Sequence, residues 1–144
     1  MTSVVLSVEG AVKNFGGVKA LVSADLTLYT REIHALLGEN GAGKSTLLKT
    51  LAGVHSLDAG TITLNGKVFS QGSTRSAREQ GIAVIYQEPN LFPDLTLAEN
   101  VFVGRQPITG AGVDWKFMES ESRALFAQLG VPLNPLIRAR GLSI

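Results

Sequence analysis

Apolar residues recur along the chain with two different spacings, and these spacings predict its elements. Between residues 26 and 29 apolar and polar positions alternate, which is typical of a half-buried strand. Between 115 and 129 apolar residues lie three and four positions apart, which is typical of one face of a helix. The predicted strands cover 4–8, 18–29, 33–37, 61–64, 67–69 and 82–86, and the predicted helices cover 44–52, 73–80, the residues after Thr96, and 115–129.

Turn and cap residues mark the ends of several of these elements. Asn65 and Gly66 separate two short strand patterns, and this pair is typical of a tight hairpin turn. Thr96 is followed three residues later by Glu99, which is the capping-box pattern of a helix start. Residues 106–112 carry no periodic pattern and are predicted to form a loop.

Strands that alternate with helices predict an α/β fold with a mostly parallel sheet. The runs 33–37 and 82–86 are apolar almost throughout, so we expect both to be buried strands of that sheet. The strands within 1–31 and 60–70 predict a smaller antiparallel β layer beside it.

The most specific motif is the loop between the run 33–37 and the next helix. It fits G-x-x-x-x-G-K-[ST], the phosphate-binding loop (P-loop), in which glycines let successive N–H groups turn inward toward an anion. The helix that begins at about Lys44 adds the positive partial charge of its N-terminus. The motif predicts that Lys44 reaches the β- and γ-phosphates of a nucleotide and that Ser45 ligates Mg²⁺. The predicted binding residues are Gly38, Glu39, Asn40, Gly41, Ala42, Gly43, Lys44, Ser45 and Thr46.

The composition of the chain limits the kinds of partner and site that we expect. The 144 residues are 44% apolar and 17% charged, which is enough for one domain with a core. The net charge of +1 directs the chain neither to nucleic acid nor to an anionic membrane. The absence of cysteine excludes disulfides and thiolate metal sites. No apolar run approaches the ~18 residues of a membrane helix, so we expect any membrane role to go through a partner.

Other titratable residues are interpreted as structural. We expect His34 to be a satisfied, half-buried histidine and His55 to be solvated after its helix. We expect the Glu39 side chain to face away from the phosphates, and Glu88 to be a surface or coupling-loop residue.

Several segments together resemble the ATP-binding subunits of ABC transporters. They are the loop 38–46 with the following Leu47-Leu48-Lys49-Thr50-Leu51-Ala52-Gly53, the turns at 58–60 and 65–66, Tyr86-Gln87, and Leu91-Phe92-Pro93-Asp94-Leu95-Thr96-Leu97-Ala98-Glu99-Asn100. The segments 15–21 and 86–89 further resemble bacterial sugar importers of the ribose, xylose, galactose and autoinducer-2 type.

The resemblance implies roles for further residues. Phe15 would stack on adenine, the N–H groups of Asn40 to Ser45 would hold the β-phosphate region, and Thr46 would touch the α-phosphate. Gln87 would ligate Mg²⁺ and orient water in the family's Q-loop, so the catalytic residues expected here are Lys44 and Gln87. The implied cofactors are ATP and Mg²⁺.

The resemblance also implies an assembly. The partners would be transmembrane permease subunits, a second ABC nucleotide-binding domain and, indirectly, a periplasmic sugar-binding protein, at the cytoplasmic face of the inner membrane. The chain would be peripheral to the membrane, as part of the ATPase that powers sugar import.

The family signature would begin at Leu142-Ser143-Ile144, so we expect 1–144 to be an incomplete ABC nucleotide-binding domain that binds ATP without hydrolysing it alone. Its parts would be the β layer (1–31 and 60–70), the P-loop core (32–59 and 81–88) and the start of a helical subdomain (94–144). Two alternatives stay open: another P-loop NTPase, such as a small-molecule kinase or GTPase, and a non-catalytic nucleotide-binding module.

Overall fold

The computed structural model describes residues 3–85, 91–140 and 142. The chain divides into two compact units, Met1–Ile85 and Tyr86–Ile144. Every helix in the described ranges is too short or too polar to span a lipid bilayer.

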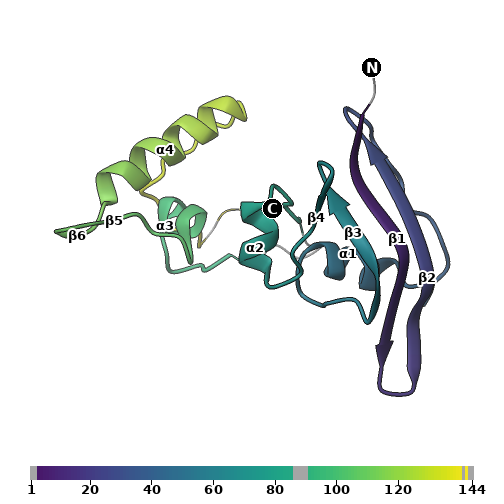
Figure 1. The fold of residues 1–144 in the computed structure, drawn as a ribbon. Coiled ribbons are helices and arrows are strands. Elements are labelled where there is room, and N and C mark those ends of the chain that lie inside the picture. Colours follow the sequence, from purple (N-terminus) through teal and green to yellow (C-terminus); the bar gives the residue numbers. More distant parts are fainter. Residues whose placement is uncertain (1–2, 86–90, 141, 143–144) are drawn as a thin grey trace. The chain divides into compact units, whose positions relative to one another are not determined.

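The first unit is built on a four-stranded antiparallel sheet (Figure 1). Its strands are β1 (Val4–Phe15), β2 (Val18–Tyr29), β3 (Ala59–Leu64) and β4 (Lys67–Val68), in the order β2-β1-β3-β4. Asn65 and Gly66 join β3 to β4 with φ of 51° and 73°, the left-handed pair that a tight hairpin needs. The antiparallel β layer predicted from the sequence is therefore confirmed, with a first strand longer than the predicted 4–8.

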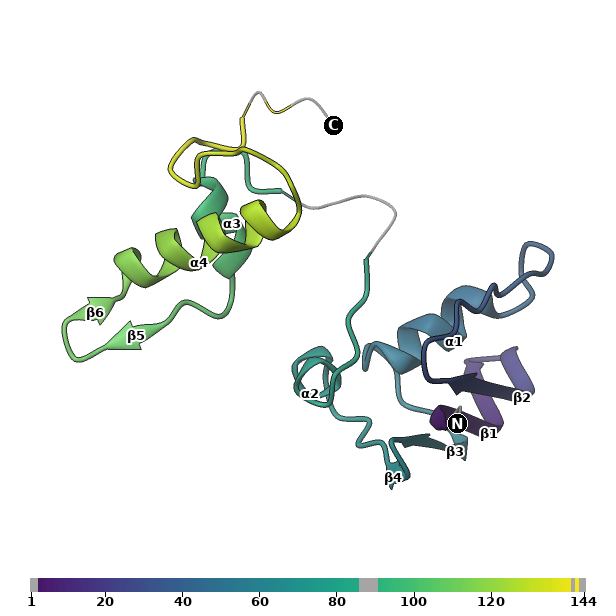
Figure 2. The same cartoon turned by 90° about the horizontal axis from the view of Figure 1, so that it is seen from above.

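Helix α1 (Lys44–Leu51) covers one face of this sheet (Figure 2). Leu47 and Leu51 belong to the same buried core cluster as the sheet residues Val8 and Ile62, because an amphipathic helix must bury its apolar stripe. Leu48, the apolar residue between them, is half exposed. Helix α2 (Thr74–Glu79), with Ser73 as its N-cap, lies within the predicted 73–80 and adds the buried Ala77 to this core.

Two predicted strands of the parallel sheet are not formed. Residues 33–37 and 82–85 lie in no strand or helix, and Ile33, Leu37 and Ile85 are 100%, 88% and 98% exposed. All strand pairings among the described residues are antiparallel. An apolar segment becomes a strand only where a neighbour takes up its N–H and C=O groups, and the described residues supply no such neighbour here. The predicted burial of both segments is therefore wrong for the residues described.

The second unit is helical. Helix α3 (Leu97–Phe102) begins with the predicted capping box, in which Thr96 accepts from the Glu99 N–H and the Glu99 carboxylate accepts from the Thr96 N–H. The backbone carbonyls of Pro135 and Ile137 accept hydrogen bonds from the N–H groups of Ala98 and Leu97. The segment 135–137 is therefore hydrogen-bonded to the first turn of α3.

Helix α4 (Trp115–Gln128) confirms the predicted 115–129 helix almost to the residue. Its buried positions are Met118 and Ser122, whereas Trp115 and Leu129, at the two ends of the predicted apolar face, are exposed. The predicted loop at 106–112 contains strand β5 (Ile108–Thr109), which pairs with β6 (Gly112–Val113). Strands of two residues leave no periodic pattern in a sequence, so the spacing of apolar residues could not reveal them.

Candidate phosphate-binding site

The predicted loop leads directly into α1. Gly43 caps the helix with φ of 84°, and its carbonyl accepts the first helical bond from the Leu47 N–H at 2.9 Å. The N–H groups of the first helical turn have no acceptor within a helix, and the first turn of α1 carries no acidic residue. The start of α1 therefore presents backbone donors and a positive dipole end to an anion.

Gly43 also allows the loop to lie against β2. A Cβ at this position would lie 2.5 Å from the carbonyl oxygen of Ala20 and 2.8 Å from Cδ2 of Leu21. No side chain fits at those distances, so the glycine permits the close approach that brings β2 beside the loop. Gly41 has a similar φ of 88°, but a Cβ there would meet no atom within 4 Å.

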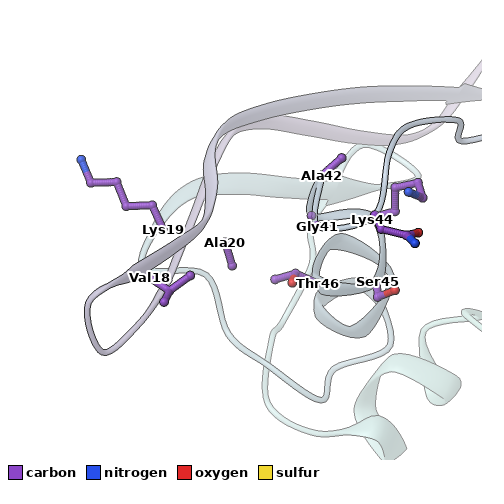
Figure 3. A pocket seen from close by; sticks show the side chains of 10 residues that line it. Val18, Lys19, Ala20, Gly41, Ala42, Lys44, Ser45 and Thr46 are labelled. Carbon is purple, nitrogen blue, oxygen red and sulfur yellow. The ribbon is translucent and has the colours of Figure 1, made fainter.

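The loop and β2 line a cavity of about 460 Å³ that is open to solvent on one side (Figure 3). This volume lies within the range of small-molecule sites. The lining residues are Val18, Lys19 and Ala20 from β2 and the seven consecutive residues 40–46. They include two lysines and no carboxylate, so the cavity wall favours an anion.

Lys44 bonds to the loop itself. Its Nζ donates to the carbonyl oxygens of Gly38 and Glu39, each at 2.6 Å. Both acceptors are neutral, so they orient the ammonium group without cancelling its charge. The positive charge of Lys44 is therefore not neutralised by these two contacts.

The site also has an oxygen donor suited to a magnesium ion. Ser45 and Thr46 lie on the first turn of α1 and line the cavity, as Figure 3 shows. Mg²⁺ prefers oxygen ligands and is commonly held by few protein groups together with substrate phosphates. The Ser45 hydroxyl fits that chemistry as one protein ligand.

Phe15 lies at the edge of this site. It ends β1 and pairs with Val18, which lines the cavity, but Phe15 is not itself a lining residue. Phe15 is 43% exposed. The His55 ring meets the Phe15 ring in a T-shaped contact with centroids 5.0 Å apart, and the Lys13 Nζ lies 5.5 Å from the Phe15 ring centroid.

Of the remaining candidate residues, some lie outside the described residues, and His34 has a structural role. Gln87 and Glu88, like Gly141, Ser143 and Ile144, lie outside the described residues. His34 pairs with Glu32 at 2.9 Å, and the hydrogen bond from this histidine, with another from the Tyr29 N–H, holds the pKa of the Glu32 carboxyl below its ordinary value. His34 therefore has a structural partner, as the sequence predicted, but it is exposed rather than half-buried.

Sequence reasoning missed the second wall of the site. Val18, Lys19 and Ala20 stand outside the P-loop motif and line the cavity only because β2 runs beside the loop. The contact of His55 with Phe15 was missed as well, since no local pattern joins residues so far apart along the chain.

Comparisons with known proteins place these features in a family. Residues 21–142 match the family described as ABC transporter. The chain is 53% identical over 140 residues to the ribose import ATP-binding protein RbsA of Rhodococcus jostii (strain RHA1), covering 96% of this chain and 28% of that protein. It is 47% identical over 139 residues to an arabinose import ATP-binding protein of Burkholderia ambifaria, covering 96% of this chain and 27% of that protein. The chain thus spans little more than a quarter of the length of these relatives.

Solved structures show the same fold. A nucleotide-free ATP-binding cassette from an ABC transporter aligns with a TM-score of 0.78 at 23% identity, over 98% of this chain and 60% of that one. A Clostridium perfringens protein that is part of an ABC transporter complex aligns with a TM-score of 0.74 at 23% identity, over 97% of this chain and 56% of that one. The predicted α/β fold of an ABC nucleotide-binding domain is confirmed by these alignments.

Proposed function

The chain belongs to the ABC transporter family, and we propose that its loop 38–46 binds the phosphates of ATP. The observation that carries this proposal is the cavity lined by seven consecutive residues at the N-terminus of α1, with the Lys44 charge uncancelled beside it. Backbone donors, a helix N-terminus and a lysine act together on the same anion. Membership of the family removes the kinase and GTPase alternatives.

Different residues of the site bind different parts of the nucleotide. The N–H groups at 40–45 hold the β-phosphate region, Thr46 contacts the α-phosphate, and Lys44 offsets the charge of the terminal phosphates. A bound Mg²⁺ would supply further positive charge to the phosphates, and Ser45 is the described residue that would hold it. Phe15, which pairs with the cavity residue Val18, offers its ring to the adenine base, with stacking worth about 1–3 kcal/mol. Gln87 stays proposed as a second magnesium ligand and a water-orienting residue.

We further propose that the chain acts in a bacterial carbohydrate importer as part of its energy-coupling ATPase. The printed names of the relatives, ribose import and arabinose import ATP-binding proteins, support this role. The partners proposed are permease subunits, a second nucleotide-binding domain and, indirectly, a sugar-binding protein. The chain would work at the cytoplasmic face of the inner membrane, attached through the permease.

Equilibrium binding of MgATP to Lys44→Ala and Lys49→Ala tests the first proposal. Both variants lose one positive charge from α1, but Lys49 is exposed near the far end of the helix and does not line the cavity. Lys44→Ala removes charge-assisted bonds worth about 1.5–3 kcal/mol, so we expect affinity to fall roughly tenfold to a hundredfold. Lys49→Ala should bind as the wild type does. Equal affinity of Lys44→Ala and wild type would contradict the proposal, as would equal losses in the two variants.

A further inference from the structure

The contact between Phe15 and His55 joins two parts of the first unit that are distant in sequence. The two rings cross at 70° with their centroids 5.0 Å apart. This edge-to-face arrangement is a favoured geometry of ring pairs and is worth about 0.5–1.5 kcal/mol beyond the area that it buries. The sequence predicted His55 to be solvated, but it is only partly exposed.

His55 is fastened to the end of helix α1. Gly53 continues from the helix in the left-handed conformation, with φ of 74°, and its N–H donates to the Thr50 carbonyl at 3.0 Å. The N–H groups of Val54 and His55 both approach the Lys49 carbonyl, at 2.9 and 3.4 Å. The position of His55 is therefore set by the helix whose first turn lines the phosphate cavity.

Phe15 lies at a half-exposed strand end. It is the last residue of β1, directly before the turn at Gly16 and Gly17, and it is 43% exposed. Apart from His55, the aromatic and cation–π contacts of its ring in the described residues consist of Lys13 at 5.5 Å. Lys13 is in turn held by an ion pair with Asp58 at 2.8 Å. A half-exposed ring at a strand end loses rotamer freedom when it stacks on a ligand, unless a neighbour has already fixed it.

We propose that His55 is a positioning residue for the nucleobase, which acts by holding the Phe15 ring in its stacking orientation. The proposal rests on the proposed nucleotide site and adds to it a residue outside the loop. Helix α1 then serves both ends of the ligand: its first turn meets the phosphates, and the turn after its last residue fixes the ring that meets the base.

Two ligands separate this role from a merely structural one. Inorganic tripolyphosphate with Mg²⁺ has the phosphates of ATP but no base, so its affinity reports the loop alone. We expect His55→Ala to weaken MgATP binding roughly twofold to tenfold, the range given by the ring-pair energy, and to leave tripolyphosphate binding unchanged. His55→Phe keeps a ring at this position and should bind MgATP like the wild type.

The double variant completes the test. If His55 acts through Phe15, then His55→Ala should cause no further loss in a Phe15→Ala background. The proposal is overturned if His55→Ala binds MgATP as tightly as the wild type, or if His55→Phe is as weak as His55→Ala. It is also overturned if tripolyphosphate and MgATP weaken equally, because the change then acts on the loop, or if the two substitutions are additive.

Failure of the underlying nucleotide site has a separate signature. If Lys44→Ala leaves tripolyphosphate binding unchanged, the loop is not the phosphate site. If Phe15→Ala leaves MgATP binding unchanged, the ring is not the base platform. Neither result depends on His55, so the two proposals are distinguished by the same set of measurements.

Discussion

Replacement of Gly43 by alanine should damage the first unit more than replacement of Gly41, although both glycines have a left-handed backbone. A residue with a Cβ pays about 1–2 kcal/mol for this conformation, and that cost applies to both positions. Only at Gly43 would the new Cβ also meet a neighbour, the Ala20 carbonyl oxygen at 2.5 Å. That oxygen belongs to the backbone of β2, so it cannot turn away as a flexible side chain could. Overpacking of this kind adds about 1–3 kcal/mol.

We therefore expect Gly43→Ala to lower the opening free energy of β1 and β2 by about 2–5 kcal/mol, and Gly41→Ala to lower it by about 1–2 kcal/mol. Native-state hydrogen exchange read by peptide measures this free energy for each strand. The second unit is an internal control, since both substitutions lie within the first unit. Equal losses in the two variants would refute the reasoning, because they would show that the approach of β2 to the loop carries no energetic weight.

Two further substitutions test the local account. Ser122→Ala should raise the stability of the second unit by about 1 kcal/mol, because the Oγ of Ser122 is buried with no hydrogen-bond partner among the described residues. Urea unfolding followed by the fluorescence of the single tryptophan, Trp115, measures this stability. A loss of stability in the variant would contradict the prediction. Asp58→Asn should remove part of the acid sensitivity of the first unit. Hydrogen bonds from Lys13 and the Asn14 N–H hold the pKa of the Asp58 carboxyl below its ordinary value. These bonds stabilise the fold fully at a pH above the ordinary pKa, and the stabilisation is lost as the pH falls through the lowered pKa of the folded state. The stability difference between wild type and Asp58→Asn should therefore shrink between about pH 6 and about pH 3, and a constant difference in thermal unfolding would contradict it.

Local signals in the sequence predicted the parts of the structure that depend on neighbouring residues. The Thr96–Glu99 capping box, the Asn65-Gly66 turn and the P-loop all have the expected form because each is closed by backbone and side-chain groups a few positions apart. The motif also identified Lys44 and Ser45 as residues of one cavity.

Features that depend on distant residues could not be predicted in the same way. The apolar runs at 33–37 and 82–86 indicated burial, but an apolar run does not specify what covers it, and the described residues of both runs are largely exposed. The wall formed by Val18–Ala20 and the ring contact of His55 arise from the course of β2 and of α1 through the first unit. These contacts exist only once the sheet and the helix have packed together.

Backbone amides at the start of α1 are proposed to hold the phosphates of ATP. A ¹H–¹⁵N NMR titration of the 15.2 kDa chain with MgATP tests it residue by residue. We expect the largest shifts to fall on Gly41, Gly43, Lys44 and Ser45, tripolyphosphate to reproduce them, and Lys44→Ala to weaken the response greatly. Shifts that leave 40–46 unchanged, or that centre on the second unit, would contradict the claim.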